Sequence, residues 1–377
     1  MSNDTLPEIR FPGFTDDWEQ RKLGEIVQIT MGQSPNSENY TENPEDYILV
    51  QGNADMKNNR VVPRVWTTQI TKQAEKGDLI LSVRAPVGDI GKTDYDVVLG
   101  RGVAAIKGND FIFQQLGKMK ESGYWNRFST GSTFESINSN DIREALITIP
   151  TGEEQQKIGT FFKQLDDTIA LQQRKLDLLK ETKKGFLQKM FPKNGAKVPE
   201  IRFPGFTEDW EERKLGDITK ISTGKLDANA MVENGKYDFY TSGIKKYRID
   251  VAAFEGPSIT IAGNGATVGY MHLADNKFNA YQRTYVLQEF LVDRSFIFSE
   301  IGNKLPKKIK QEARTGNIPY IVMDMLTELK LSIPQNNSEQ QKIGSFFKQL
   351  DDTIALHQRK LDLLKETKKG FLQKMFV

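Results

Sequence analysis

The sequence EQQKIGTFFKQLDDTIALQQRKLDLLKETKKGFLQKMF at residues 154–191 decides the fold, because it occurs a second time at residues 339–376. The two copies differ only at Thr160/Ser345 and at Gln172/His357. Apolar residues recur in each copy with the spacing of a heptad, which predicts a helix with one apolar stripe. A helix of 38 residues is about 55 Å long and needs a partner that covers this stripe.

The two predicted helices are the obvious partners for each other, and a twofold-related pair must run antiparallel. Gln172 lies at the centre of the first copy and His357 is its equivalent, so the two are predicted to meet near the twofold axis. The alternative is that both side chains face solvent. The predicted helix–helix interface consists of Ile158, Phe162, Leu165, Ile169, Gln172, Leu176, Leu179, Ile343, Phe347, Leu350, Ile354, His357, Leu361 and Leu364.

A second repeat precedes each of the two helices. PEIRFPGFTDDWEQRKLGEI (7–26) returns as PEIRFPGFTEDWEERKLGDI (199–218), whereas residues 27–153 and 219–338 show no comparable match. A recent tandem duplication would have left these parts alike, so they have separate origins or have been exchanged. The predicted domains are 1–153 (head and first variable part), 154–198 (first helix and linker), 199–338 (head and second variable part) and 339–377 (second helix).

Each variable part shows strand-like alternation interrupted by Gly and Pro, which predicts a compact α+β domain. Each also ends with a polar loop, a short helix and a strand, in TGSTFESINSNDIREALITIP and TGNIPYIVMDMLTELKLSIP. The predicted fold class is α+β: two globular α/β domains joined by two long antiparallel helices, a coiled coil with pseudo-twofold symmetry.

Composition excludes several kinds of chemistry. The chain has no Cys and two His, which rules out disulfides, Cys-bound zinc and a thiol nucleophile and suits a reducing cytoplasm. Its start has no signal-peptide pattern, and no segment approaches the roughly 18 apolar residues of a membrane span, so a soluble cytoplasmic protein is expected. Residues 27–150 hold 13 Lys and Arg against 15 Asp and Glu, and residues 219–333 hold 15 against 12. Any basic surface must therefore be local.

Local groups of basic and amide side chains are suited to nucleic acid, because Lys and Arg contact phosphates or guanine and Asn or Gln can read adenine. Such groups are also typical of ordinary solvated surface. The candidates, taken as polar and basic positions in predicted loops, are Gln33, Ser34, Lys57, Asn58, Asn59, Arg60, Arg64, Arg84, Arg101, Ser132, Thr133, Lys225, Lys245, Lys246, Tyr247, Arg248, Asn264, Gln282, Arg283, Lys307, Lys308 and Arg314.

Three stretches resemble enzyme motifs but lack residues or spacing that those motifs require. GDIGKT (88–93) lacks the first Gly of a phosphate-binding loop, since Pro86 occupies that place. AGNGATVG (262–269) has the spacing GxGxxxG and no helix-like sequence after it, which indicates a turn between strands. Glu212-Arg213-Lys214 ends like a nuclease motif but lacks an acidic partner, and we interpret it as a charged helix face. The sequence predicts no catalytic residue and no metal site.

The head PEIRFPGFTxDWExRKLG, the closing IP…EQQKIGxFFxxLDxxI and the twofold alternation of shared and variable parts resemble the specificity subunit of type I restriction-modification systems. GKLDANAMVENGKYDFYTSG and KFNAYQRTYVL are also similar to pieces of that family's target recognition domains. The resemblance covers nearly the whole chain, because several segments match in order and twice over.

The resemblance implies a non-catalytic subunit that reads a bipartite, asymmetric double-stranded DNA target. Its partners would be methyltransferase subunits, two being expected, and restriction subunits bound through the complex. The chain itself would hold no cofactor; S-adenosylmethionine, ATP and Mg would belong to those partners. A scaffold or DNA-mimicking adaptor that never binds a duplex is the alternative, and the near-neutral charge favours it modestly.

Overall fold

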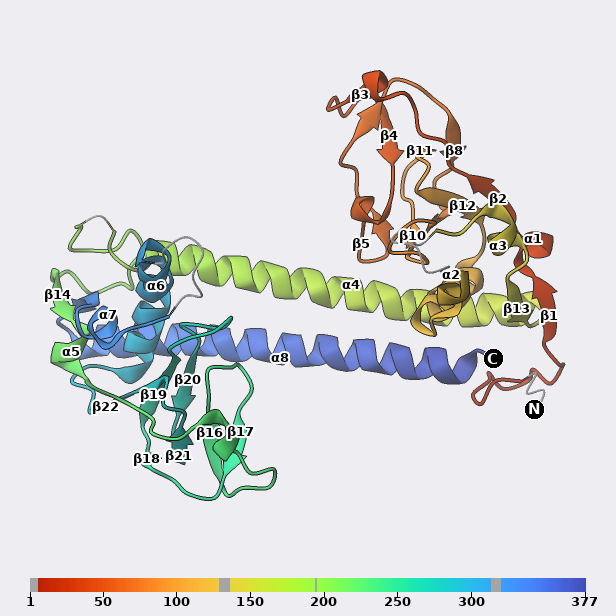
Figure 1. The fold of residues 1–377 in the computed structure, drawn as a ribbon. Coiled ribbons are helices and arrows are strands. Elements are labelled where there is room, and N and C mark those ends of the chain that lie inside the picture. The colour runs from red at the N-terminus through yellow and green to blue at the C-terminus, as the bar shows by residue number, and fades with distance from the viewer. Residues whose placement is uncertain (1–5, 129–135, 194, 313–319) are drawn as a thin grey trace. The chain divides into compact units, whose positions relative to one another are not determined.

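The chain folds into two units, each containing part of both long helices (Figure 1). The computed structural model describes residues 6–128, 136–193, 195–312 and 320–377. Unit 1 comprises residues 1–174 and 359–377, and unit 2 comprises residues 175–358. No helix in the described ranges is long and apolar enough to cross a membrane.

The long helices are α4 (Gly152–Lys189) and α8 (Asn337–Met375), and they pack antiparallel within each unit. In unit 1, Asp166 pairs with Lys368 at 2.7 Å, and the rings of Phe161 and Phe371 lie 5.1 Å apart. In unit 2, Lys183 pairs with Asp351 at 2.5 Å in the same way. The predicted antiparallel helix pair is thus confirmed.

The predicted stripe is covered along both helices. Its buried members are Ile158, Phe162, Gln172, Leu176, Ile343, Phe347 and Leu361, and its half-buried members are Leu165, Ile169, Leu179, Leu350, Ile354, His357 and Leu364. Gln172 belongs to unit 1 and His357 to unit 2, and their contact stays a prediction.

The described part of unit 1 contains three sheets, and its helix at Asp110–Glu121 packs on α4. A two-stranded sheet joins β1 to β13, a six-stranded sheet has the order β2-β12-β9-β10-β6-β5, and a five-stranded sheet has the order β3-β7-β4-β11-β8. Its strands are β1 (Glu19–Lys22), β2 (Gln28–Met31), β3 (Tyr40–Thr41), β4 (Tyr47–Val50), β5 (Met56–Lys57), β6 (Arg60–Val61), β7 (Trp66–Thr67), β8 (Lys72–Ala74), β9 (Leu79–Ser82), β10 (Ile90–Lys92), β11 (Val97–Leu99), β12 (Val103–Lys107) and β13 (Leu146–Ile149). Its short helices are α1 (Leu23–Ile26), α2 (Asp110–Glu121) and α3 (Ser139–Arg143).

Unit 2 has the same plan with fewer strands. Its sheets have the orders β14-β23, β15-β22-β19-β20 and β17-β16-β21-β18. Its strands are β14 (Trp210–Lys214), β15 (Lys220–Thr223), β16 (Tyr237–Tyr240), β17 (Tyr247–Ile249), β18 (Phe254–Glu255), β19 (Ser258–Ala262), β20 (Met271–Ala274), β21 (Lys277–Ala280), β22 (Thr284–Gln288) and β23 (Lys330–Pro334). Its short helices are α5 (Leu215–Ile218), α6 (Arg294–Glu312) and α7 (Met323–Thr327).

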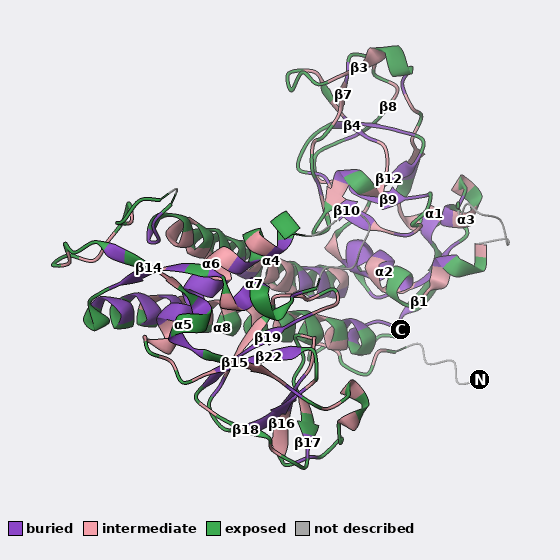
Figure 2. Ribbon diagram, turned by 60° about the vertical axis from the view of Figure 1, so that its left-hand side comes forward, coloured by how far each residue is buried: buried purple, intermediate pink, exposed green. Residues whose placement is uncertain are grey.

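An aromatic cluster of the same composition forms the core of each unit. In unit 1, Phe111 of α2 packs on Trp18 and on Phe376 with ring centroids 5.7 and 5.0 Å apart. In unit 2, Phe296 of α6 packs on Trp210 at 5.7 Å and on Phe191 at 5.7 Å. Buried residues (purple in Figure 2) extend from these clusters into the sheets. Phe111 and Phe296 are therefore equivalent, and so are α2 and the start of α6.

The repeated sequence EQQKIGxFF, which we call the socket segment (154–162 and 339–347), joins each variable domain to its helix. Arg10 of the head donates to both carboxylate oxygens of Glu154 at 2.7 and 2.8 Å, and Glu154 is fully buried. These hydrogen bonds raise the pKa of Arg10. Arg202 donates to Glu339 at 2.6 and 2.8 Å in unit 2, and the pKa of Arg202 is raised for the same reason.

Two further residues of the socket segment, a Gln and a Gly, determine how the helix of the variable domain begins. This helix is α6 in unit 2 and α2 in unit 1. The Gln340 side chain accepts from the Asp293 backbone N–H at 2.9 Å and donates to the Pro334 carbonyl at 2.9 Å. At Gly344 an added Cβ would meet the backbone nitrogen of Phe296 at 2.7 Å, so only glycine lets α6 approach this closely. In unit 1 a Cβ added at Gly159 would likewise meet the backbone nitrogen of Phe111 at 2.9 Å.

Several sequence-based assignments are wrong. Glu212-Arg213-Lys214 is not a helix face but part of β14, because the backbone of residues 210–214 pairs with that of residues 330–334. Lys307 and Lys308 do not lie in a loop but on α6, whose buried residues Phe296, Ile301 and Leu305 pack in the core of unit 2. In both cases tertiary packing overrides the local preference of a charged sequence. Four other candidates expected in loops lie in strands: Lys57 in β5, Arg60 in β6, and Tyr247 and Arg248 in β17. These residues are extended because β5 pairs with β6 and β17 pairs with β16. AGNGATVG forms a turn between β19 and β20, as predicted.

Candidate nucleic-acid interface

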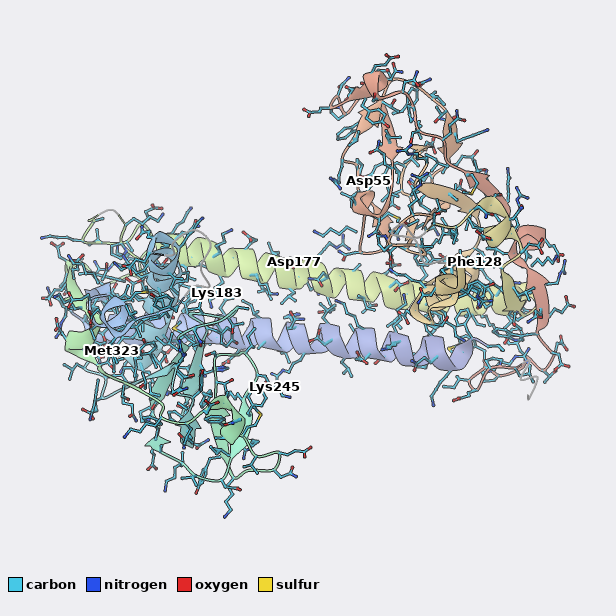
Figure 3. The ribbon with its side chains drawn as sticks, in the orientation of Figure 1. Asp55, Phe128, Asp177, Lys183, Lys245 and Met323 are labelled. Carbon is cyan, nitrogen blue, oxygen red and sulfur yellow. The ribbon has the colours of Figure 1, made fainter. Side chains whose placement is uncertain are left out.

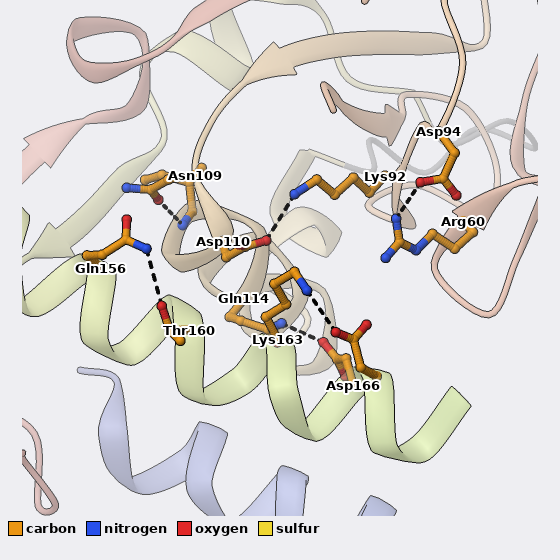
Figure 4. Close-up of polar contacts among 12 residues, drawn as sticks. Arg60, Lys92, Asp94, Asn109, Asp110, Gln114, Gln156, Thr160, Lys163 and Asp166 are labelled. Atoms are coloured by element: carbon orange, nitrogen blue, oxygen red, sulfur yellow. Dashed lines mark hydrogen bonds and ion pairs between the residues drawn. The ribbon is translucent and has the colours of Figure 1, made fainter. Parts of the chain in front are cut away.

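The first group of candidates in unit 1 lies at and next to the hairpin of β5 and β6, with Asn58 and Asn59 in the turn. Lys57, Asn58 and Asn59 are exposed, and the two asparagines have φ of 52° and 59°, a conformation that asparagine tolerates well. Arg60 pairs with Asp94 at 2.8 Å (Figure 4), and Arg64 donates to the Ala54 carbonyl at 2.7 Å and lies 3.7 Å from Asp55. Arg60 and Arg64 thus have partners within unit 1 itself.

The basic group of candidates in unit 2 surrounds the loop between β16 and β17, where Lys245 lies (Figure 3). Arg248 pairs with Asp238 at 2.5 Å and also donates to two backbone carbonyls. Lys246 lies 4.0 Å from Asp238 and over the ring of Tyr240, and Lys245 lies over the ring of the half-buried Tyr247. Burial raises the pKa of Tyr240 to about 12, with a further contribution from Asp238.

The basic run on α6 is engaged in local contacts. Lys308 pairs with Glu312 at 2.5 Å, and Lys307 donates to the Asn303 side chain at 3.3 Å. Ser132, Thr133 and Arg314 lie outside the described residues.

The remaining candidates in unit 1 meet at one place, which we call the loop junction of unit 1 (residues 32–34, 83–84, 100–102 and 136–137). The Val83 N–H donates to the Gly102 carbonyl at 2.9 Å, and the Ile137 N–H donates to the Val83 carbonyl at 3.0 Å. The Arg101 N–H donates to Ser34 Oγ at 3.1 Å, and the Gln33 N–H donates to the Leu99 carbonyl. The side chains of Gln33, Arg84 and Arg101 are exposed on this backbone.

The loop junction of unit 2 (224–226, 263–264, 281–283 and 320–321) repeats these contacts with different residues. The Gly263 N–H donates to the Arg283 carbonyl at 2.8 Å, and the Ile321 N–H donates to the Gly263 carbonyl at 2.7 Å. The Gln282 N–H donates to the Leu226 carbonyl at 2.8 Å. Isolated bridges pair Arg84 with Ser136 in unit 1 and Asn264 with Tyr320 in unit 2. These contacts make Arg84 equivalent to Asn264.

Comparing the backbone hydrogen bonds of the two junctions also shows which of their neighbouring residues are equivalent. Gly32 donates to the Val103 carbonyl at 3.0 Å and Gly224 to the Thr284 carbonyl at 3.1 Å, which makes the next residues, Gln33 and Lys225, equivalent. Further equivalent pairs are Arg101 with Gln282, Gly102 with Arg283, and Ser136 with Tyr320. Each junction thus carries cations and amides, but at different positions.

The cations of the two junctions differ from Arg60, Arg64, Lys246, Arg248 and Lys308, which all lie beside a carboxylate of the fold. Arg84, Arg101, Lys225 and Arg283 are exposed, and within the part of the chain that the structure describes none forms an ion pair. An exposed cation without an internal carboxylate can contact a DNA phosphate or base without first breaking an ion pair. The structure therefore brings eight candidates together at the junctions, namely Gln33, Ser34, Arg84, Arg101, Lys225, Asn264, Gln282 and Arg283.

Sequence reasoning missed several residues in or next to the junction of unit 2. Ser242 donates from Oγ to Asn264 Oδ1 at 2.5 Å and is itself held by Thr267, whose hydroxyl donates to the Ser242 carbonyl. Tyr320 is exposed beside Asn264. His272 packs between Tyr240 and Tyr270, and burial lowers its pKa, so this side chain is neutral near pH 7. A Tyr directly after the polar sequence TGNIP was the one available signal.

A second surface lies on the long helices and carries exposed leucines. Leu171 lies five residues after Asp166, and Leu363 lies five residues before Lys368, so the two leucines lie at the same level of the antiparallel helices in unit 1. Their exposed fractions are 44% and 67%. In unit 2, Leu178 and Leu356 occupy the same place relative to Lys183–Asp351 and are 68% and 59% exposed. Each unit thus has one equivalent pair of exposed leucines.

The described residues contain no group of three or more His, Cys, Asp or Glu side chains arranged to hold a metal ion. The junctions instead present donors and amides on fixed backbone. Such an arrangement can bind a polyanion and distinguish the edges of bases.

Comparison with known families gives a match over most of the chain. A model of the type I restriction modification DNA specificity domain matches residues 15–181 and again residues 207–366. The chain is also 22% identical over 408 residues to the type I restriction enzyme MjaIX specificity subunit of Methanocaldococcus jannaschii, with 95% of this chain and 92% of that protein covered.

Other relatives match over a shorter stretch. The type I restriction enzyme EcoDI specificity subunit of Escherichia coli is 32% identical over 167 residues, which covers 44% of this chain and 37% of that protein. The match to the putative MjaX specificity subunit of M. jannaschii covers 41% of its length. The aligned part is thus less than half of these two relatives.

The fold resembles that of a solved protein. The crystal structure of the type I restriction-modification system S subunit from M. genitalium has a TM-score of 0.76 to this chain, covers 99% of both chains and shares 18% sequence identity. At this identity the similarity concerns the fold.

Proposed function

The chain belongs to the family of the type I restriction modification DNA specificity domain, and on that premise we propose that it is the DNA-recognising subunit of such a system. Each unit would bind one half of a split double-stranded target through its loop junction. The observation that carries this proposal is that two junctions with one backbone arrangement present different cations and amides. Two different reading surfaces call for two different half-sites, so the target would be asymmetric.

The proposed subunit carries out no chemistry of its own. The Gly-rich sequences that resemble cofactor loops lie in or between strands: GDIGKT contains β10, and AGNGATVG connects β19 to β20. Methylation with S-adenosylmethionine, and cleavage driven by ATP with Mg, would belong to partner subunits. Such a complex would act on DNA in the cytoplasm.

The exposed leucines support a partner surface on the helices. Leu171 and Leu363 of unit 1 and Leu178 and Leu356 of unit 2 are equivalent pairs in an otherwise charged helix surface. Large exposed apolar side chains that recur at equivalent positions favour a protein partner. We propose that one methyltransferase subunit binds to each pair, which gives two per chain, and that restriction subunits join through this complex.

The test is to map modified adenines in the genome of a host that expresses this chain with its methyltransferase partner. A single two-part motif that disappears when this chain is omitted would support the proposal. Modification without this chain, or no motif with it, would contradict it.

Binding in solution separates a DNA-reading subunit from a scaffold. The complex of the chain with its methyltransferase should bind a duplex carrying the mapped motif with an affinity that falls steeply with salt, because phosphate contacts release counterions. An affinity for DNA that does not change with salt would indicate a scaffold.

A further inference from the structure

The equivalent positions of the two loop junctions carry side chains with different base preferences. Arg84 of unit 1 is replaced by Asn264 in unit 2, and Arg101 is replaced by Gln282. Arginine matches the two acceptors O6 and N7 of guanine in the major groove, whereas Asn and Gln match the donor N6 and the acceptor N7 of adenine. The two units therefore present guanine-type and adenine-type readers at the same places.

The backbone at these positions is fixed before any ligand binds. Arg84 and Asn264 each follow a residue whose N–H and carbonyl both form backbone hydrogen bonds, at Val83 and at Gly263. The N–H groups of Arg101 and Gln282 are also bonded, to Ser34 Oγ and to the Leu226 carbonyl. A side chain that starts from fixed backbone loses less conformational freedom on binding, which favours selective contacts.

The amide of Asn264 is oriented as adenine recognition requires. Ser242 donates to its Oδ1 at 2.5 Å, which identifies that atom as the acceptor and leaves the Nδ2 donors free of this contact. Oδ1 has a second lone pair for the adenine N6 amino group, and Nδ2 can donate to N7. Ser242 is held in turn by Thr267, so the orientation has support behind it.

The cations at the other positions fit a different role. In unit 2, Lys225 and Arg283 flank the two amides, and both are exposed without an internal ion pair among the described residues. In unit 1, the amide of Gln33 occupies the position of Lys225, and Gly102 that of Arg283. Unit 2 thus has cations beside its readers that suit phosphates, whereas the cations of unit 1 occupy the reader positions themselves.

We propose that Arg84 and Arg101 recognise guanine in the half-site bound by unit 1, and that Asn264 and Gln282 recognise adenine in the half-site bound by unit 2. This inference rests on the proposed function and goes beyond it by assigning base types to named residues. Each of the four is a specificity-determining residue, and each affects one half of the target only.

The experiment uses the full chain in complex with its methyltransferase partner and maps the modified motif for the wild type and for Arg84→Ala, Arg101→Ala, Asn264→Ala and Gln282→Ala. The two arginine variants should each relax a guanine position in one half of the motif. The other two should each relax an adenine position in the other half. The preference for the correct base should fall about 5- to 150-fold at that position, as expected for one lost bidentate contact.

Two controls test whether the effect belongs to the junctions. Arg64→Ala and Arg248→Ala remove arginines that are bonded inside units 1 and 2, and both variants should keep the wild-type motif. Gln282→Ala removes an exposed side chain and keeps the Ser242–Asn264 contact. This variant therefore remains informative if Asn264→Ala is unstable.

The outcomes distinguish this inference from the proposed function. A two-part wild-type motif that all four alanine variants leave unchanged would overturn the base assignment but not the role in DNA recognition. Relaxation at a base of the other type, or in both halves at once, would overturn it too. A wild-type complex that modifies no two-part motif would refute the proposed function, and the base assignment with it.

Discussion

The buried pair Arg202–Glu339 makes the sharpest stability prediction. Glu339 is fully buried and accepts two hydrogen bonds from Arg202, which also donates to the Glu208 carbonyl at 2.8 Å. Arg202→Ala leaves the carboxylate of Glu339 buried without its charge partner. Removing one member of a buried pair costs about 3 to 5 kcal/mol of folding free energy. We expect a loss of this size, located in unit 2.

Arg202→Ala is destabilising because the Glu339 carboxylate is left desolvated without a partner, rather than because the Arg202–Glu339 attraction is strong. A double variant separates these two causes. Replacing both partners with apolar residues, as in Arg202→Met with Glu339→Leu, removes the buried charge altogether. Such replacements are often neutral. The double variant should therefore be more stable than Arg202→Ala by about 2 kcal/mol or more, so the effects of the two changes are not additive.

The assay can follow unit 2 alone. The four tryptophans are Trp18, Trp66, Trp125 and Trp210, and only Trp210 belongs to unit 2. Trp210 is buried against Phe296 and Phe191, so its fluorescence changes when this core opens. Urea unfolding is measured in a background in which the other three are replaced by Phe. A reporter within the unit is needed because two units need not unfold in one step.

A matched control is the exposed pair Lys330–Glu212, whose side chains are 64% and 62% exposed. Lys330→Ala should cost less than about 1 kcal/mol. The reasoning is refuted if Arg202→Ala costs no more than this control, or if the double variant is as unstable as the single one.

Three further predictions concern other contacts. Burial raises the pKa of Glu300 to about 7, above its unfolded value, so unit 2 should lose up to about 3 kcal/mol as pH rises from 4.5 through 7. Glu300→Gln, which introduces the residue found at the equivalent position Gln115, should abolish this slope in urea titrations at several pH values; an unchanged slope would contradict the assignment. Gly344→Ala should cost about 1 to 3 kcal/mol by displacing Phe296, whereas Gly185→Ala, with open space around it, should stabilise α4 by up to about 1 kcal/mol; thermal unfolding compares the two. Inserting one helical turn into both α4 and α8 should change the spacer of the modified motif, and an unchanged spacer would show that helix length does not set it.

Helix register was predictable from the sequence because it depends on a local pattern. Ile158, Phe162 and their equivalents Ile343 and Phe347 recur at heptad spacing and are buried as that spacing requires. The end of each variable domain was predictable as well, since α3 with β13 and α7 with β23 follow polar sequences rich in Gly, Ser, Thr and Asn. These elements have sequences in which local preference and burial agree.

The helix α6 and the strand β14 were not predictable, because neither follows its local preference. α6 contains Pro306 and a run of lysines, and it is held by the buried residues Phe296 and Leu305 in the core of unit 2. β14 is charged along most of its length and is extended because β23 pairs with it. Both depend on residues distant in the sequence.

The loop junctions could be found only in the structure, and their construction explains why. The equivalence of Arg84 and Asn264 rests on backbone hydrogen bonds, which place no demand on the side chain at either position. Gly32 and Gly224 are different, because a Cβ there would meet a carbonyl oxygen at 2.1 and 1.9 Å. The glycines and hydrogen bonds thus hold the geometry, and exposed side chains can change at little cost to folding. Because these exposed residues can change without loss of the fold, equivalent positions of the two junctions share no sequence pattern that would reveal them.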